Sequence, residues 1–251
     1  MNVAETNTVA QTVTENIKAA HVFKKYGIDF CCGGNVTIEN ACKKAKIDQA
    51  KLISDLENID QVTDLNHDYK SWDADFLADY IFNIHHTYVE ESIPLILQYG
   101  KKVTKVHGHH YKELSEIFRL FEEVAAELGG HLKKEELILF PFVKKLVVAK
   151  RTKTKVDTPQ FQTVDNPIKM MEEEHETAGE IMHQIAILSN NYTPPEGVCN
   201  TFRAYYAKLD EFEQDLHKHV HLENNILFPK ALALEKEVST YFQGKPTKHS
   251  I

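Results

Sequence analysis

Apolar residues recur at helical spacing over most of the chain. Between about residues 72 and 236, positions i, i+3 and i+4 are repeatedly apolar, as in Phe202, Tyr205, Tyr206 and Leu209, which is typical of amphipathic helices. This pattern predicts four long helices. The first three span about 73–106, 111–148 and 166–190, and the fourth begins after Pro195 and runs past Phe228. The predicted fold class is all-α, an up-and-down four-helix bundle.

Prolines place the bends and one start of these helices. Pro94 and Pro229 are expected to kink the first and the fourth helix, because proline cannot donate a backbone hydrogen bond inside a helix. Asn166 followed by Pro167 is expected to be the N-cap and the first helical residue of the third. The Lys- and Thr-rich stretch 151–165 is expected to be a polar loop.

The N-terminal quarter has its own pattern, which predicts a small helical domain. Apolar positions run at helical spacing from Val9 to Phe23. Two short helices are predicted at 37–45 and 48–57, the second with Asp48 as its N-cap. The expected parts of the chain are an N-terminal domain at 1–68 ending in a polar linker at 63–70, the bundle at 69–240 and a C-terminal tail at 241–251.

Composition excludes several classes of protein. The net charge of −8 argues against general binding of nucleic acid, which requires a basic face. No apolar run of about 18 residues suggests a membrane span, and the first residues do not form a signal peptide. Four cysteines in 251 residues do not make a disulfide framework. These features together favour a reducing cytoplasm.

One segment of the second predicted helix recurs in the fourth. It begins at His131 and again at His219, 88 residues later, and both copies end in Ile-Leu-Phe-Pro. Each copy places a His and a Glu four residues apart, on one face of a helix. The two pairs are His131 with Glu135 and His219 with Glu223. Facing helices that carry such pairs build dinuclear metal sites in bundles.

The first and third helices are expected to supply the remaining ligands. The third offers His175, which precedes His219 by 44 residues. The first offers His86, which precedes His131 by 45 residues, and His85, which precedes it by 46, so the spacing favours His86 only slightly. Adjacent helical residues point about 100° apart, so only one of the two is expected to face the centre. Imidazoles with bridging carboxylates favour iron or manganese over structural zinc.

Other histidines and cysteines give weaker signals. His107 lies where the first helix is expected to end, and a cation there is stabilised by the helix dipole alone. His217 and His221 flank His219 and are predicted to lie behind the ligands or on the surface. Cys42 and Cys199 are predicted to pack in the core.

Cys31 and Cys32 are candidate redox thiols. They precede Gly33-Gly34, which would let a helix begin there and lower a thiol pKa. A disulfide between adjacent cysteines would be strained and labile. The alternative interpretation is that both are small apolar residues packed in the core of the N-terminal domain.

The motifs resemble a known family. The segment 26–34 resembles the N-terminal domain of ScdA type, and 131–141, 172–176 and 219–229 resemble a hemerythrin-like domain. Together, in this order, they resemble the RIC family of di-iron proteins for the repair of iron centres. The resemblance implies two iron ions in a carboxylate-bridged centre with four His and two Glu. Carried onto this chain, the ligands are His86, His131, Glu135, His175, His219 and Glu223. His86 is preferred because the family's ligand lies eight residues before the proline that matches Pro94.

The resemblance also implies a function. Family members restore iron–sulfur clusters damaged by nitric oxide or peroxide by releasing iron, in the cytoplasm and often as dimers. The expected partners are damaged iron–sulfur proteins, nitric oxide or oxygen, and a second copy of the chain, but no nucleic acid or membrane. One alternative is a hemerythrin-like protein that binds or reduces nitric oxide or oxygen. A di-iron oxidase is disfavoured, because ferritin-like enzymes use Glu-x-x-His and this chain has His-x-x-x-Glu.

Overall fold

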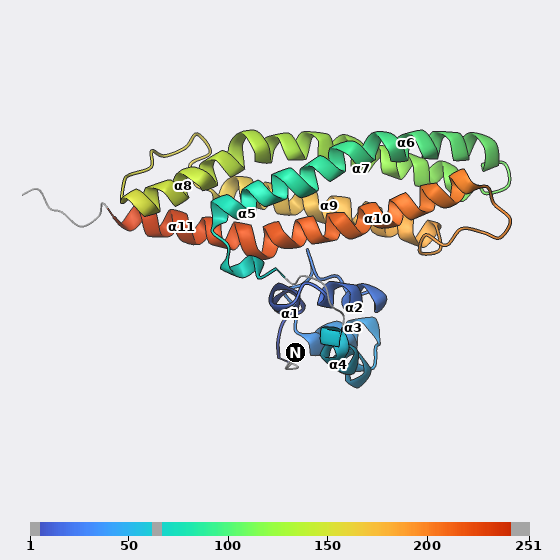
Figure 1. The fold of residues 1–251 in the computed structure, drawn as a ribbon, viewed down its shortest axis with the longest axis horizontal. Coiled ribbons are helices and arrows are strands. Elements are labelled where there is room, and N and C mark those ends of the chain that lie inside the picture. The colour runs from blue at the N-terminus through green and yellow to red at the C-terminus, as the bar shows by residue number, and fades with distance from the viewer. Residues whose placement is uncertain (1–5, 62–66, 242–251) are drawn as a thin grey trace, which may run out of the picture.

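The computed structural model describes residues 6–61 and 67–241. Four long helical rods form an elongated bundle, and a group of short N-terminal helices packs against one side of it (Figure 1). Within the described residues the regular structure is helical apart from one bridge between Thr8 and Thr37. The predicted all-α class is confirmed. Residues 63–66, half of the predicted linker at 63–70, and nearly all of the tail at 241–251 lie outside the described residues.

Each of three rods contains a π-helical turn. The first rod consists of α5 (Ala74–Tyr80), the turn η3 (Ile81–His86) and α6 (Thr87–His107). The second consists of α7 (Glu113–Lys134), η4 (Glu135–Leu139) and α8 (Phe140–Thr152). The third is α9 (Asp165–Leu188), and the fourth consists of α10 (Asn200–Leu222), η5 (Glu223–Leu227) and α11 (Phe228–Thr240). The four predicted helices therefore correspond to the four rods.

Two prolines lie just beyond π-helical turns. Pro141 and Pro229 are each the second residue after η4 and η5, so a wider turn precedes each residue that lacks a backbone donor. Pro94 lies inside α6, which continues through it. The predicted cap of the third helix is wrong, because α9 already begins at Asp165. The side-chain amide of Asn166 instead donates a hydrogen bond of 2.9 Å to the backbone carbonyl of Phe161.

The N-terminal domain contains short helices. Their bounds are α1 (Val9–Glu15), α2 (Ala19–Lys25), α3 (Ile38–Ala45) and α4 (Gln49–Glu57), followed by the 3₁₀ turns η1 (Asn58–Gln61) and η2 (Tyr69–Ser71). The pattern expected to be continuous from Val9 to Phe23 is broken at Asn16, whose side chain accepts a bond from the Lys18 amide. Asp48 is the N-cap of α4, as predicted, and accepts from Ala50 N at 3.0 Å.

The apolar core of the bundle is divided in two. One cluster holds α6, α7, α10 and the later part of α9, and the N-terminal helices join it through residues such as Phe23 and Phe30. The other holds α5, α8, α11 and the start of α9. Tyr69, from the predicted linker, is buried in the second cluster. Its ring lies edge-on to that of Trp72, with ring centroids 4.8 Å apart. Between the two clusters lies a layer of buried polar side chains.

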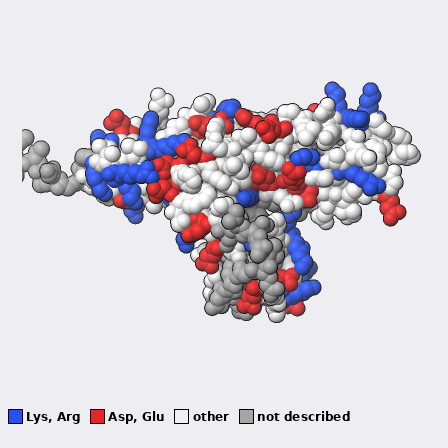
Figure 2. Space-filling view, in the orientation of Figure 1, with Lys and Arg blue, Asp and Glu red and all other residues white. Residues whose placement is uncertain are grey.

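Charge is distributed unevenly over the surface. Lys and Arg side chains gather at the end of the bundle formed by α8 and α11 (Figure 2). Several are compensated there by ion pairs between rods, including Lys150 with Glu237 and Arg151 with Asp75. None of the described helices is both long and apolar enough to cross a bilayer.

Candidate metal centre

Six buried side chains from all four rods meet in the polar layer. They form two groups, in each of which the ligand atoms lie within 4.8 Å of one another. One group is His86, Glu135, His219 and Glu223, and the other is His131, Glu135, His175 and Glu223. Both carboxylates belong to both groups. All six residues predicted as ligands from the sequence are therefore brought together.

Each carboxylate lies between two histidines of different groups. Glu135 Oε2 is 3.4 Å from His86 Nε2 and 3.4 Å from His131 Nε2. Glu223 Oε1 is 3.0 Å from His219 Nε2, and its Oε2 is 3.2 Å from His175 Nε2. A carboxylate with an oxygen near each of two metal positions can bridge them, as in the dinuclear centres of other helix bundles.

The π-helical turns coincide with the ligands. Glu135 begins η4, Glu223 begins η5, and His86 ends η3. Such turns are frequent at functional sites because they change the direction of side chains within a helix. His85 and His86 are both buried, each 1% exposed, but only His86 is part of the two groups, so one of the pair faces the metal positions as expected. His86 belongs to a ligand group, whereas His85 Nδ1 lies 2.9 Å from Asp215 Oδ1.

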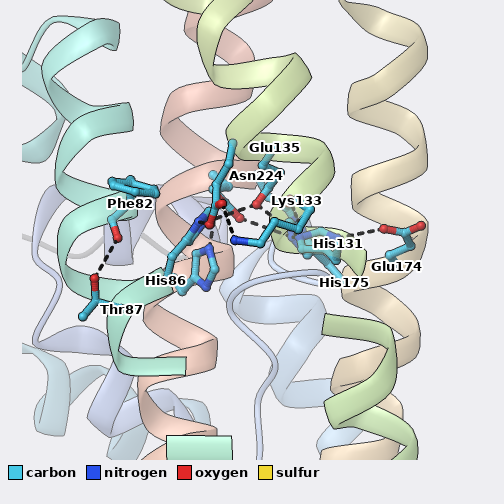
Figure 3. A network of polar contacts seen from close by, with 12 residues as sticks. Phe82, His86, Thr87, His131, Lys133, Glu135, Glu174, His175 and Asn224 are labelled. Atoms are coloured by element: carbon cyan, nitrogen blue, oxygen red, sulfur yellow. Dashed lines mark hydrogen bonds and ion pairs between the residues drawn. The ribbon is translucent and has the colours of Figure 1, made fainter. Parts of the chain in front are cut away.

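Three of the four ligand histidines have a polar partner on the outer nitrogen. His86 Nδ1 is 3.1 Å from Glu136 Oε1, and His131 Nδ1 is 2.8 Å from Glu174 Oε2 (Figure 3). His175 Nδ1 is 2.8 Å from Asn224 Oδ1. Such partners fix the tautomer and orientation of the ring, so that Nε2 faces the metal position.

These outer partners were not predicted from the sequence, although their positions in it carry a signal. Each one is the chain neighbour of a ligand and supports a histidine on a different rod. Glu136 follows Glu135, Asn224 follows Glu223, and Glu174 precedes His175. Neighbouring residues on a helix point in different directions, so a residue beside an inward ligand is well placed to reach the adjacent rod.

The donor atoms fit a pair of cations. Within the described part of the chain, both oxygens of Glu135 and Oε2 of Glu223 are buried and make no hydrogen bond. A buried carboxylate without such bonds is destabilising by several kcal/mol unless a cation compensates it. Imidazole nitrogens with carboxylate oxygens suit iron or manganese.

The electrostatics of the centre agree with this fit. Burial tends to raise the pKa of Glu135 and Glu223, but the adjacent histidines hold both carboxyl pKa values below the ordinary value, that of Glu223 well below. Burial tends to lower the pKa of His86 and His131, but the close contacts and the negative charge of the Glu135 and Glu223 carboxylates raise these pKa values to about 10 and about 9. The centre therefore holds ionised carboxylates and stabilises positive charge between them.

The Cys31–Cys32 segment differs from the prediction. Cys31 is buried and Cys32 half-buried, in a turn capped by the Asp29 carboxylate, which accepts from the Cys31 and Gly33 amides at 2.9 and 2.7 Å. No helix begins there. A hydrogen bond with Cys32 and burial raise the pKa of Cys31 well above the ordinary value, contrary to the lowered pKa expected. The two thiols are free, with Sγ atoms 3.8 Å apart.

Two further predictions change. Cys42 is buried as expected, but Cys199 is exposed, and its Sγ lies 3.2 Å from His107 Nε2. His221, on α10, is fully buried. Its Nε2 lies 3.4 Å from Thr14 Oγ1 on α1, so it is enclosed where the N-terminal domain meets the bundle. Burial lowers the pKa of His221 to about 4.

A buried layer of shared His and Glu side chains within a four-helix bundle defines a cation-binding protein of hemerythrin type. Residues 77–231 match the hemerythrin HHE cation binding domain, and residues 5–60 match a domain of unknown function called ScdA_N. The chain is 34% identical over 215 residues to the iron–sulfur cluster repair protein YtfE of Edwardsiella ictaluri, covering 86% of this chain and 91% of that protein.

Two other relatives show the same similarity. The probable iron–sulfur cluster repair protein of Haemophilus influenzae is 35% identical over 217 residues, with 85% of this chain and 91% of that protein covered. The iron–sulfur cluster repair protein ScdA of Staphylococcus haemolyticus is 32% identical over 222 residues, with 88% and 96% covered. The chain belongs to this family of iron–sulfur cluster repair proteins, and it has the family's His/Glu site for two metal ions.

Proposed function

We propose that this chain is a di-iron protein that repairs iron–sulfur clusters damaged by nitrosative or oxidative stress, and that it does so by supplying iron. The single observation that carries the proposal is the sharing of Glu135 and Glu223 between two histidine groups. Relatives that cover most of the chain are named for cluster repair. Iron bound at the two positions would supply an exchangeable, redox-active cation.

The protein's own residues have separate tasks in this proposal. His86 and His219 hold one cation, His131 and His175 hold the other, and the two carboxylates hold both. The outer partners Glu136, Glu174 and Asn224 keep the imidazoles oriented. The buried position of the layer between two apolar clusters excludes bulk water from the metal positions.

The N-terminal region has a different task. We assign residues 1–68 to an N-terminal domain that carries the redox thiols Cys31 and Cys32, and residues 69–240 to the di-iron bundle. Both thiols are free and adjacent, which suits exchange of electrons or iron with a partner. We further infer a cytoplasmic homodimer whose recipients are damaged iron–sulfur proteins, in line with the family resemblance.

Iron transfer is the decisive measurement. The purified protein is expected to hold about two iron atoms per chain and to show near-ultraviolet oxo-to-iron absorption. Incubation with an iron–sulfur enzyme damaged by nitric oxide should restore that enzyme's activity and reduce the iron content of the protein. A single zinc ion without that absorption would contradict the proposal. Consumption of nitric oxide without iron transfer would favour the alternative, a hemerythrin-like protein that binds or reduces nitric oxide.

A further inference from the structure

His219 differs from the other three histidines of the centre. The Nδ1 atoms of the others lie within 3.1 Å of a carboxylate or amide oxygen. Nδ1 of His219 is buried and has no hydrogen-bond partner in the described part of the chain. Because an outer partner fixes the tautomer and orientation of a ligand imidazole, this ring requires one.

Two other unpartnered polar atoms lie on residues beside His219. The imidazole of His85 is nearly parallel to that of His219, with ring centroids 5.6 Å apart and an interplanar angle of 13°. Nε2 of His85 is buried and makes no hydrogen bond within the described residues. Its Nδ1 is held by Asp215 Oδ1, and the other oxygen of Asp215 is likewise buried and unpartnered. Asp215 precedes His219 by four residues, one turn of α10.

We propose that Asp215 and His85 form the outer arm of His219, connected to it by one buried water molecule. His85 donates from Nδ1–H to Asp215, so its Nε2 is an acceptor. The two rings make no direct bond, because His219 Nδ1 and His85 Nε2 are both without a hydrogen-bond partner within the described residues. A buried water usually makes about three hydrogen bonds. Two of these bonds join the rings: His219 Nδ1–H donates to the water and the water donates to His85 Nε2, while Asp215 belongs to the arm through its contact with His85 Nδ1.

This arm makes the two metal positions unequal. The position of His131 and His175 is supported by direct bonds from Glu174 and Asn224. The position of His86 and His219 depends partly on a water-mediated contact. Asp215, at the far end of that contact, lines a pocket of about 320 Å³ between the N-terminal domain and the bundle, together with Phe30. The metal ion at His86 and His219 is therefore the one that leaves first.

The inference rests on the proposed function, since it identifies the iron that is supplied. The test uses the full chain with His85→Phe, which keeps a ring against His219 but removes Nε2, and His85→Gln, which restores an acceptor. Tyr80→Phe is the matched control, because the Tyr80 ring also packs against His85, with ring centroids 5.7 Å apart. The measurements are Mössbauer spectra of the iron-loaded proteins and the rates at which a chelator removes the first and second iron.

His85→Phe should retain two irons but change the spectrum of one of them. Its first iron should leave roughly 10-fold faster, the lower end of the range for loss of an outer partner, with the second rate unchanged. The spectrum and the release rate of His85→Gln should lie closer to those of the parent, and those of Tyr80→Phe should equal the parent's. Parent-like spectra and rates in His85→Phe, or equal acceleration of both irons, would overturn the inference. If circular dichroism shows that His85→Phe does not fold, Asp215→Asn takes its place as the test. Its first iron should also leave faster than in the parent, by a smaller factor.

Failure of the proposed function gives a different result. In that case the parent itself lacks iron or transfers none to a damaged cluster. Cobalt(II), whose visible absorption reports its ligands, then serves as the probe for the same three variants. A change in the spectrum of one of two bound cobalt ions in His85→Phe still supports the arm, and an unchanged spectrum overturns it.

Discussion

The side-chain amide of Asn225 donates a hydrogen bond of 3.2 Å to the backbone carbonyl of Cys31. Asn225 is the second residue after Glu223, which belongs to both ligand groups, and Asn224 between them holds His175. One π-helical turn therefore contacts the metal positions, supports a ligand and binds the cysteine segment. The cysteine segment is thus joined by one hydrogen bond to the turn that begins with Glu223.

Replacing Asn225 should loosen the cysteine segment without removing metal. Asn225→Ala loses the bond to Cys31, worth about 1 kcal/mol, and this corresponds to at least roughly a five-fold increase in the population of open conformations, because the contact of Asn225 with His221 Nδ1 at 3.1 Å is lost as well. Alkylation of Cys31 and Cys32 should accelerate by that factor, while iron content stays at the parent value. Asn200→Ala, at an exposed position of α10, is the control. Unchanged alkylation in Asn225→Ala would mean that the bond does not hold the segment in place.

The shared carboxylates should be indispensable for binding both metal ions. Glu135→Gln and Glu223→Gln keep the size of the side chain but remove a negative charge and a bridging oxygen, so each should lose at least one of two iron equivalents. His183→Ala, at an exposed position of α9, should retain both. Iron content measured by plasma emission on the purified variants decides. Equal iron in all three variants would exclude a bridging role.

Outer partners should affect affinity rather than stoichiometry. Glu174→Gln weakens the charge-assisted contact with His131 Nδ1, and loss of such a partner typically lowers metal affinity by roughly 10–100-fold. Competition with a chelator of known affinity measures this change. Glu173→Gln alters the adjacent, exposed carboxylate and should bind like the parent. If both variants bind alike, the contact with His131 contributes nothing to the centre.

Removal of the metal should destabilise the bundle. Both oxygens of Glu135 and Oε2 of Glu223, which make no hydrogen bond within the described residues, then lose the metal ions that they would hold. A ligand present at 100 times its Kd adds about 2.7 kcal/mol to the free energy of unfolding, which corresponds to roughly 5–10 °C in Tm for a chain of this size. Differential scanning calorimetry with and without a chelator measures the shift. In Glu135→Gln the shift should be much smaller, and a full shift there would point to metal bound elsewhere.

The sequence was sufficient to predict the rods and the six His and Glu residues that the structure brings together. Helical periodicity depends only on which face is buried, and the two His-x-x-x-Glu pairs are local in the chain. Spacing alone did not separate His85 from His86, because positions counted along a regular α-helix shift where η3 is a π-helical turn. Both side chains are buried, each with its own polar contacts.

Contacts between distant segments were also beyond the sequence. The raised pKa of Cys31 depends on burial and on the side chains of Cys32 and Asp29, which a turn rather than a helix brings together. The burial of His221 depends on docking of α1, through Thr14, against the bundle. Periodicity describes one helix at a time and carries no information about such docking.

The last prediction separates iron binding from repair. Cys31→Ser with Cys32→Ser in the full chain should keep about two irons, because all six proposed ligands lie in the bundle and neither thiol belongs to a ligand group. Reactivation of an iron–sulfur enzyme damaged by nitric oxide should nevertheless fall by an order of magnitude or more, because these are the adjacent free thiols of the described chain and Cys32 is half-buried rather than enclosed. Cys199→Ser, which removes the exposed thiol beside His107, is the control and should repair clusters normally. Full repair by the double variant would leave Cys31 and Cys32 with a packing role, and the N-terminal domain would then serve the bundle by another means, such as dimerisation.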